Sequence, residues 1–88
     1  MQIKFTKHAL ERVKERKVTT KQVLLTIKKP DLKTLEEEDL LSVYKKFNHL
    51  ALKVVLKQEE DEIRVVTVHW VEKERLTKLK PLIEGEKI

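Results

Sequence analysis

The residues from Leu50 to Trp70 constrain the fold more than any other stretch of this chain. Apolar side chains occupy every second position of residues 50–57, and residues 63–70 are rich in β-branched side chains. Alternation and β-branching are both typical of pleated strands, in which successive side chains point to opposite faces. The acidic break at residues 59–61 is short enough for a hairpin loop. The stretch therefore predicts two adjacent antiparallel strands that carry most of the core.

The segments around this hairpin complete an α+β domain. We expect helices over residues 7–17 and from a cap at Thr19 or Thr20 to Pro30, strands over residues 31–35 and 40–47, and a short helix over residues 72–80. Residues 1–5 fit either a short strand or an ordered arm. The predicted fold class is therefore two N-terminal helices packed on a three- or four-stranded antiparallel meander, with a short C-terminal helix. Residues 1–82 form one compact domain in this interpretation, and residues 83–88 form a loose tail.

The alternation also predicts which side chains face the helices. The expected main core consists of Leu10, Val13, Val23, Ile27, Leu52, Val54, Val66 and Val68. If Val66 and Val68 point inward, then Thr67 and His69 point outward, together with Ile63 and Val65, whereas Arg64 shares the inner side. The outer face is then polar with a basic element, formed by Tyr44, Lys46, Lys53, Thr67 and His69.

Charge is abundant and unevenly distributed. The 88 residues include 40% charged side chains, carry a net charge of +5 and contain no cysteine. Residues 1–33 hold ten basic and three acidic residues, a balance of +7, whereas residues 34–88 have a balance of −2. A one-sided basic surface suits a polyanion such as nucleic acid, and the alternative is a solvated helical surface without such a partner. Without a membrane-spanning run or a secretory signal, the expected location is the cytoplasm.

The N-terminal helix resembles a known family. It contains His8-Ala9, Arg12 and Arg16 in the pattern His-Ala-x-x-Arg-x-x-x-Arg, and a hydrophobic strand ending in Thr67 follows later. These residues resemble the domain-of-unknown-function 4258 family over roughly residues 5–70. The resemblance implies a compact fold similar to RelE- and BrnT-like toxins, which are small ribonucleases of toxin–antitoxin systems. Two features depart from this pattern, because Lys17 stands where the family usually has glycine and no arginine-rich catalytic strand is present.

Metal-free RNA cleavage requires proton donors and acceptors together with cations that hold phosphate. Histidine suits proton transfer because its pKa lies near neutrality, which makes His8 and His69 candidates, with Tyr44 as a weaker acid. The candidate phosphate-binding residues are Arg12, Arg16, Lys46, Lys53 and Arg64. For His8 and His69 the alternative is a structural role in hydrogen bonding. No metal site and no cofactor are predicted.

Three functional hypotheses follow from these residues. The first is a toxin-like domain that binds RNA or cleaves it as a metal-independent ribonuclease, with a partner antitoxin. The second is a non-catalytic interaction module, such as a homodimer formed through an exposed strand edge. The third, ranked last, is a DNA-binding regulator that uses the two helices. Clustering of His8, Arg12, Arg16 and His69 around one concavity would favour the first, and their dispersal would favour the second.

Overall fold

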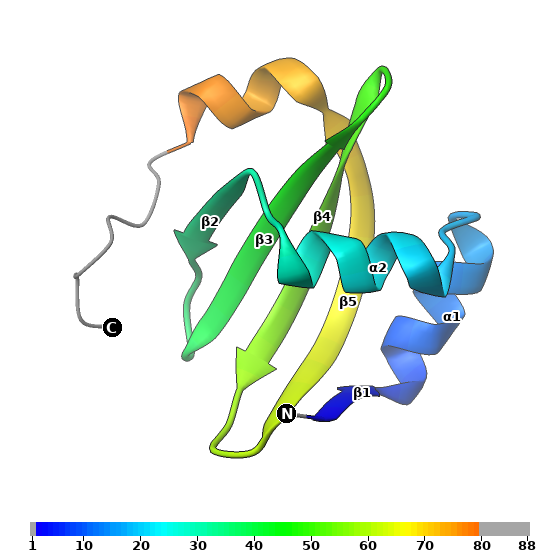
Figure 1. Cartoon of the computed structure of the whole chain (residues 1–88), viewed down its shortest axis with the longest axis vertical. Helices are drawn as coiled ribbons and strands as arrows, with labels where there is room; N and C mark the ends of the chain where they lie inside the picture. Colours follow the sequence, from blue (N-terminus) through cyan, green and yellow to red (C-terminus); the bar gives the residue numbers. More distant parts are fainter. Residues whose placement is uncertain (1, 80–88) are drawn as a thin grey trace.

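One five-stranded sheet organises the part of the chain that the structure describes. The structure is a computed structural model and describes residues 2–79. Within these residues the strand order is β1-β5-β4-β3-β2, and two α-helices and a 3-10 helix, η1, complete the fold (Figure 1). The elements are β1 Gln2–Phe5, α1 Lys7–Glu15, α2 Thr20–Lys28, β2 Leu32–Leu35, β3 Leu40–Phe47, β4 Leu50–Gln58, β5 Glu62–Glu72 and η1 Lys73–Lys78.

The α+β class and the central hairpin are confirmed, but the antiparallel meander is only part of the sheet. Strands β2 to β5 pair antiparallel in chain order, as predicted. Strand β1 adds a fifth strand, and it pairs in parallel with the first half of β5, from Gln2 opposite Glu62 to Phe5 opposite Val65. The prediction of three or four strands, all antiparallel, was therefore wrong. A strand of four residues placed before two helices gives too little pattern to reveal its partner.

Side-chain caps and a left-handed residue determine where the two helices begin and end. The hydroxyls of Thr6 and Thr19 accept hydrogen bonds from the third residue after them, and Gln22 completes a capping box on Thr19. Helix α1 ends two residues earlier than predicted, because Lys17 has a φ of 53°. The Val18 N–H then donates to the Val13 carbonyl at 3.0 Å, which is the Schellman pattern that usually has glycine at the left-handed position.

A bulge in β5 changes which of its side chains point toward the helices. Val55 lies opposite Thr67 whereas Leu56 lies opposite Val65, so Val66 is an extra residue without a partner in β4. Val65 and Val68 are both fully buried, and Val66 is only half-buried. The predicted faces are therefore correct for residues 67–70 and inverted for residues 63–66. A prediction from strict alternation fails here, because one inserted residue moves each side chain that precedes it in β5 to the opposite face of the sheet.

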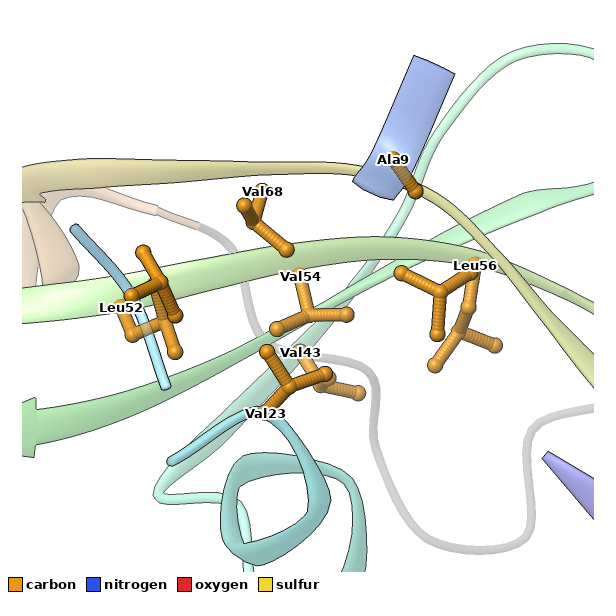
Figure 2. Close-up of a cluster of buried hydrophobic side chains, with 9 residues drawn as sticks. Ala9, Val23, Val43, Leu52, Val54, Leu56 and Val68 are labelled. Atoms are coloured by element: carbon orange, nitrogen blue, oxygen red, sulfur yellow. The ribbon is translucent and has the colours of Figure 1, made fainter. Parts of the chain in front are cut away.

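The main core lies between the sheet and the two helices. Leu52, Val54 and Leu56 of β4 follow one another along its centre, with Val23 of α2 facing Val43 of β3 (Figure 2). The predicted core positions Leu52, Val54, Val23 and Val68 are confirmed, and Val13 and Ile27 pack at its margin. Leu10 is wrong, because its side chain is 56% exposed, and the fully buried Ala9 faces the sheet instead. A small residue at this position allows α1 to approach the sheet closely.

A second, smaller apolar cluster occupies the opposite face of the sheet. Tyr44, Ala51 and Leu76 are buried together there, with Leu79 packed against them. The predicted C-terminal helix is thus a 3-10 helix of six residues that packs on the outer face, away from α2. Part of the surface expected to be polar is therefore covered. The predicted tail at residues 83–88 lies outside the described residues. No helix within residues 2–79 is long and apolar enough to cross a membrane.

The bulge can be tested by a pair of alanine substitutions at adjacent valines. Val65→Ala should lower the free energy of unfolding by about 2 kcal/mol, because it removes fully buried methyl groups and leaves a cavity. Val66→Ala, the matched control, should lower it by less than about 1 kcal/mol, since its side chain is only half-buried. Urea denaturation measures both values, and a larger loss at Val66 than at Val65 would contradict the observed register.

Candidate functional site

Helix α1 takes the place of a neighbouring strand along the second half of β5. Strand β1 ends at Phe5, opposite Val65, so the backbone groups of β5 beyond that point have no strand partner on this side. The Thr6 hydroxyl donates to the Val66 carbonyl at 3.3 Å, and the Arg16 guanidinium donates to the Val68 carbonyl at 2.9 Å. Buried backbone carbonyls require such partners. The two ends of α1 therefore complete the hydrogen bonding of the β5 edge.

Arg16 connects both faces of the sheet at this edge. Its backbone carbonyl accepts a hydrogen bond from the Trp70 indole nitrogen at 2.8 Å, on the side of the helices. Its guanidinium also contacts Nδ1 of His69, which points to the outer face. Three groups of β5 thus hold one arginine, two of them through its side chain. Arg16 has a structural role in addition to the phosphate-binding role expected from the sequence.

The contact with Arg16 determines the protonation state of His69. A guanidinium only donates hydrogen bonds, so Nδ1 of His69 must accept, and the neutral ring then carries its proton on Nε2. Burial lowers the pKa of His69 below its usual range, and the positive charges of Arg16, Lys53, Arg12 and His8 lower it further, in that order. His69 is therefore a neutral hydrogen-bond donor through Nε2. This state does not suit a general base, because the nitrogen that could accept a proton already faces a cation.

Three of the predicted site residues lie in one row across the outer face. Tyr44 of β3 pairs with Lys53 of β4, and Lys53 pairs with His69 of β5. The Lys53 ammonium lies 5.8 Å from the centre of the Tyr44 ring, a distance at which the cation is attracted to the aromatic face. Arg16 extends this row at the β5 edge. We refer to Tyr44, Lys53, His69 and Arg16 as the cross-sheet row.

Glu36 is a member of this site that the sequence analysis missed. Residues 36–39 form an acidic turn between β2 and β3, with positive φ values at Glu38 and Asp39. The Glu36 carboxylate, however, accepts a hydrogen bond from the Ser42 hydroxyl at 2.6 Å and lies 3.4 Å from the Lys53 ammonium. The Ser42 bond and the Lys53 charge lower the pKa of Glu36. The sequence offers one indication of this contact: Glu36 lies four residues before β3, and Ser42 of β3 points to the outer face.

The remaining predicted residues are dispersed to different degrees. Arg12 is bound to Glu15 at 2.6 Å within α1, and exposed His8 lies on the same helix. Arg64 lies near the other end of β5 and is paired with Glu59 and Glu62. Of the eight predicted site residues, the structure thus joins Arg16, His69, Lys53 and Tyr44, and it separates Arg64 from them.

Two further polar groups of the outer face bear on the site. The Thr67 hydroxyl is buried without a hydrogen-bond partner in the described part of the chain, two residues before His69. The exposed Lys46 lies on β3 two residues beyond Tyr44 and thus on the same face, and its backbone N–H donates to the Asp31 carboxylate at 2.8 Å. Within residues 2–79, no group of three or more histidine, aspartate or glutamate side chains is placed to hold a metal ion.

Clustering of His8, Arg12, Arg16 and His69 around one concavity would have favoured the toxin-like hypothesis, but the hollows of the outer face do not gather these residues. Two hollows of the outer face share Lys53, and neither is lined by any of those four residues. Arg12 and His8 nevertheless lie close enough to His69 to influence its pKa. The arrangement is a row of side chains across the sheet with hollows beside it.

The sequence from α1 to the end of this row matches a known family. The pattern of the family described as Domain of unknown function (DUF4258) aligns with residues 5–70. The chain belongs to the DUF4258 family. The matched region includes the helix with Ala9 and Arg16 and the strand with His69, and it leaves η1 outside. No curated protein sequence and no solved structure matched the chain.

The structure gives physical reasons for the residues that carry the DUF4258 resemblance. Ala9 is fully buried where α1 meets the sheet, and Arg16 holds the β5 edge and His69. Lys17, which replaces the usual glycine, occupies the left-handed position after α1. A residue with a Cβ atom costs about 1–2 kcal/mol there, so the lysine places an extra cation beside Arg16 at a cost in stability.

The protonation state of His69 can be measured directly. In an NMR titration, its imidazole should show a midpoint below the ordinary value of 6.5, and the nitrogen shifts at pH 7 should show a protonated Nε2 and an unprotonated Nδ1. Arg16→Gln retains a donor for Nδ1 but removes the charge, so the midpoint should rise. A midpoint at or above 6.5, or a protonated Nδ1, would contradict the assigned contact.

The same shift predicts how stability depends on pH. The unfolded chain takes up a proton on His69 at a higher pH than the folded protein does, so the free energy of unfolding should fall as pH decreases below about 6.5. His69→Gln, which does not titrate, should reduce this decrease.

Proposed function

We propose that this DUF4258 domain binds RNA. The observation that carries the proposal is the convergence of cations where α1 meets α2, adjoining the cross-sheet row. The eight residues from 14 to 21 span this tight turn and include four cations, namely Lys14, Arg16, Lys17 and Lys21. We refer to these four residues as the basic corner. The three lysines are exposed, and no ion pair within the described residues engages them. Such lysines are available to neutralise phosphates.

The cross-sheet row would extend this contact beyond the backbone of the nucleic acid. Arg16 belongs to both the basic corner and the row, so a strand that binds the corner would lie next to His69. A neutral Nε2–H donor suits a phosphate oxygen or a 2′-hydroxyl, and the 2′-hydroxyl is the group that distinguishes RNA from DNA. Phosphate contacts supply affinity, whereas such hydrogen bonds supply discrimination.

The geometry supports binding better than cleavage. Cleavage would require a group that accepts the 2′-hydroxyl proton, and the arrangement of His69 with Arg16 leaves no free acceptor nitrogen. Tyr44 is 3% exposed and packs against η1, away from the basic corner. His8 is exposed on α1, and within residues 2–79 no hydrogen bond joins its side chain to another proton-transfer group. We therefore propose that the domain binds RNA. Ribonuclease activity is an additional possibility that a cleavage assay tests.

The family resemblance also supports the proposal that the domain binds RNA. The resemblance to this family implies a compact fold similar to that of RelE- and BrnT-like toxins. We propose on this basis that the chain is a toxin-type domain, and that an antitoxin protein is a second partner. A neighbouring reading frame that encodes a small antitoxin-like protein would support this part of the proposal.

RNA binding should depend steeply on salt and on the basic corner. Fluorescence anisotropy with a mixed-sequence single-stranded RNA should give a log–log salt slope of about −0.7 for each phosphate neutralised. The double variant Lys14→Gln/Lys21→Gln should therefore reduce the slope by about 1.4 and weaken binding to many sequences alike. The same mixtures, resolved on a gel, report cleavage.

The matched control removes the same charge elsewhere. Lys33 and Lys57 are exposed lysines on β2 and β4, and Lys33→Gln/Lys57→Gln should change the slope much less. Equal effects of the two double variants would indicate unspecific attraction, and no binding at low salt would refute the proposal. Cleavage that His69→Ala abolishes would show instead that the domain is a ribonuclease.

A second candidate function is a non-catalytic homodimer. Strand β2 lies at the edge of the sheet, and Leu35 at its end is 50% exposed beside a hollow of about 420 Å³. Asp39 and Lys57 line the same hollow, so two copies related by a twofold axis could place opposite charges together. Sedimentation should then show a dimer that Leu35→Ser dissociates, whereas a monomer at high protein concentration would exclude this candidate.

A further inference from the structure

A small hollow on the outer face has the chemistry of an anion site. It lies between η1 and the sheet, has a volume of about 100 Å³ and is lined by Tyr44, Lys53, Val71, Arg75 and Leu79. Sites for drug-sized ligands measure about 300–1,000 Å³, so this hollow has room for a single small group. It lies partly outside the DUF4258 match, because Val71, Arg75 and Leu79 follow residue 70.

Two cations from different elements reach this hollow. Lys53 reaches the hollow from β4 and Arg75 from η1, and Tyr44 of β3 lines a third side. Arginine presents a fork of donors that matches the oxygens of phosphate, whereas lysine acts as a point charge. Val71 and Leu79 supply apolar walls, and Leu79 packs in the same cluster as Tyr44. Apolar walls exclude water and strengthen the attraction between a bound anion and the cations.

One carboxylate competes for this site. Glu36 lies 3.4 Å from the Lys53 ammonium, on the side of Lys53 where the second hollow of the outer face opens. It neutralises part of the charge of Lys53 and is held there by Ser42. On the opposite side of Lys53, His69 is neutral and adds no charge. Arg75 has no ion-pair partner among the residues described, so the site has a net positive charge even with Glu36 in place.

We propose that this hollow binds a phosphate group, presented either as free inorganic phosphate or as the terminal phosphate of an oligonucleotide. A terminal group fits because it projects from a chain end into a small cavity, whereas an internal phosphodiester carries nucleosides on both sides. The site is distinct from the basic corner, and it does not require that the proposed RNA binding be correct.

Titration with sodium phosphate at constant ionic strength tests the site. Amide NMR spectra of the full chain should show saturable shifts at Tyr44, Lys53 and Arg75. Lys53→Gln and Arg75→Gln should each weaken phosphate binding by about tenfold or more, because each removes a charge-assisted hydrogen bond. Lys78→Gln, on η1 but outside the hollow, should leave the affinity unchanged.

Glu36→Gln provides a test in the opposite direction. It retains a hydrogen-bonding group for Ser42 and removes the competing charge, so phosphate should bind several-fold more tightly. Glu37→Gln, an exposed neighbour in the same turn, should have no such effect. Non-saturable shifts, or weaker binding by Glu36→Gln, would overturn the inference.

A pair of RNA oligonucleotides distinguishes the two sources of phosphate. If the site receives a chain end, a 5′- or 3′-phosphorylated oligonucleotide should bind more tightly than its hydroxyl-terminated counterpart, and Arg75→Gln should abolish the difference. Equal binding of the two, together with saturable binding of inorganic phosphate, would assign the site to the free anion. Failure of the oligonucleotides to bind at all would refute the proposed function while leaving the phosphate titration as the test of this site.

Discussion

The structure depends on how the unpaired edge of β5 is covered. A long central strand whose neighbour β1 ends after four residues leaves carbonyl groups without partners, and an exposed row of this kind is both costly and prone to unwanted pairing. Helix α1 solves this with two side chains, Thr6 at its start and Arg16 at its end. Trp70 binds the Arg16 carbonyl from the other face, so the arginine is held on both sides of the sheet. The orientation of α1, and with it the placement of the basic corner, follows from these contacts.

The same arrangement connects stability to chemistry. Arg16, which donates a hydrogen bond to the β5 edge, also determines the tautomer of His69. His69, the residue type best suited to proton transfer, therefore becomes a neutral hydrogen-bond donor. Elsewhere on the outer face, the Glu36 carboxylate, which the Ser42 hydroxyl holds in place, offsets part of the positive charge of Lys53. The charge of Lys53 on the outer face is thus partly offset by one carboxylate. The exposed lysines of the basic corner and Arg75 beside the small hollow are among the cations that have no ion-pair partner within residues 2–79.

The bulge at Val66 determines what the outer face displays. It brings Val65 into the core while Thr67 and His69 still point outward, so one strand presents apolar residues to the helices on both sides of the irregularity. Thr6 binds the carbonyls of Val65 and Val66, which places the bulge where β1 ends and α1 begins. Bulges are over-represented at sheet edges and next to active sites, where they redirect a side chain.

Local patterning by itself determined the α+β class, the central hairpin, the helix caps and most of the core on β4, because alternation, β-branching and threonine caps act over only a few residues. It also placed Tyr44, Lys53 and His69 on one face, since residues 67–70 lie beyond the bulge and keep the expected phase. Only the tertiary structure decided the parallel pairing of β1, the burial of Ala9 in place of Leu10, and the contacts of Arg16 and Glu36. These features join residues up to 60 positions apart, such as Thr6 and Val66, and no local periodicity encodes which distant edge, carbonyl or cation a side chain will meet.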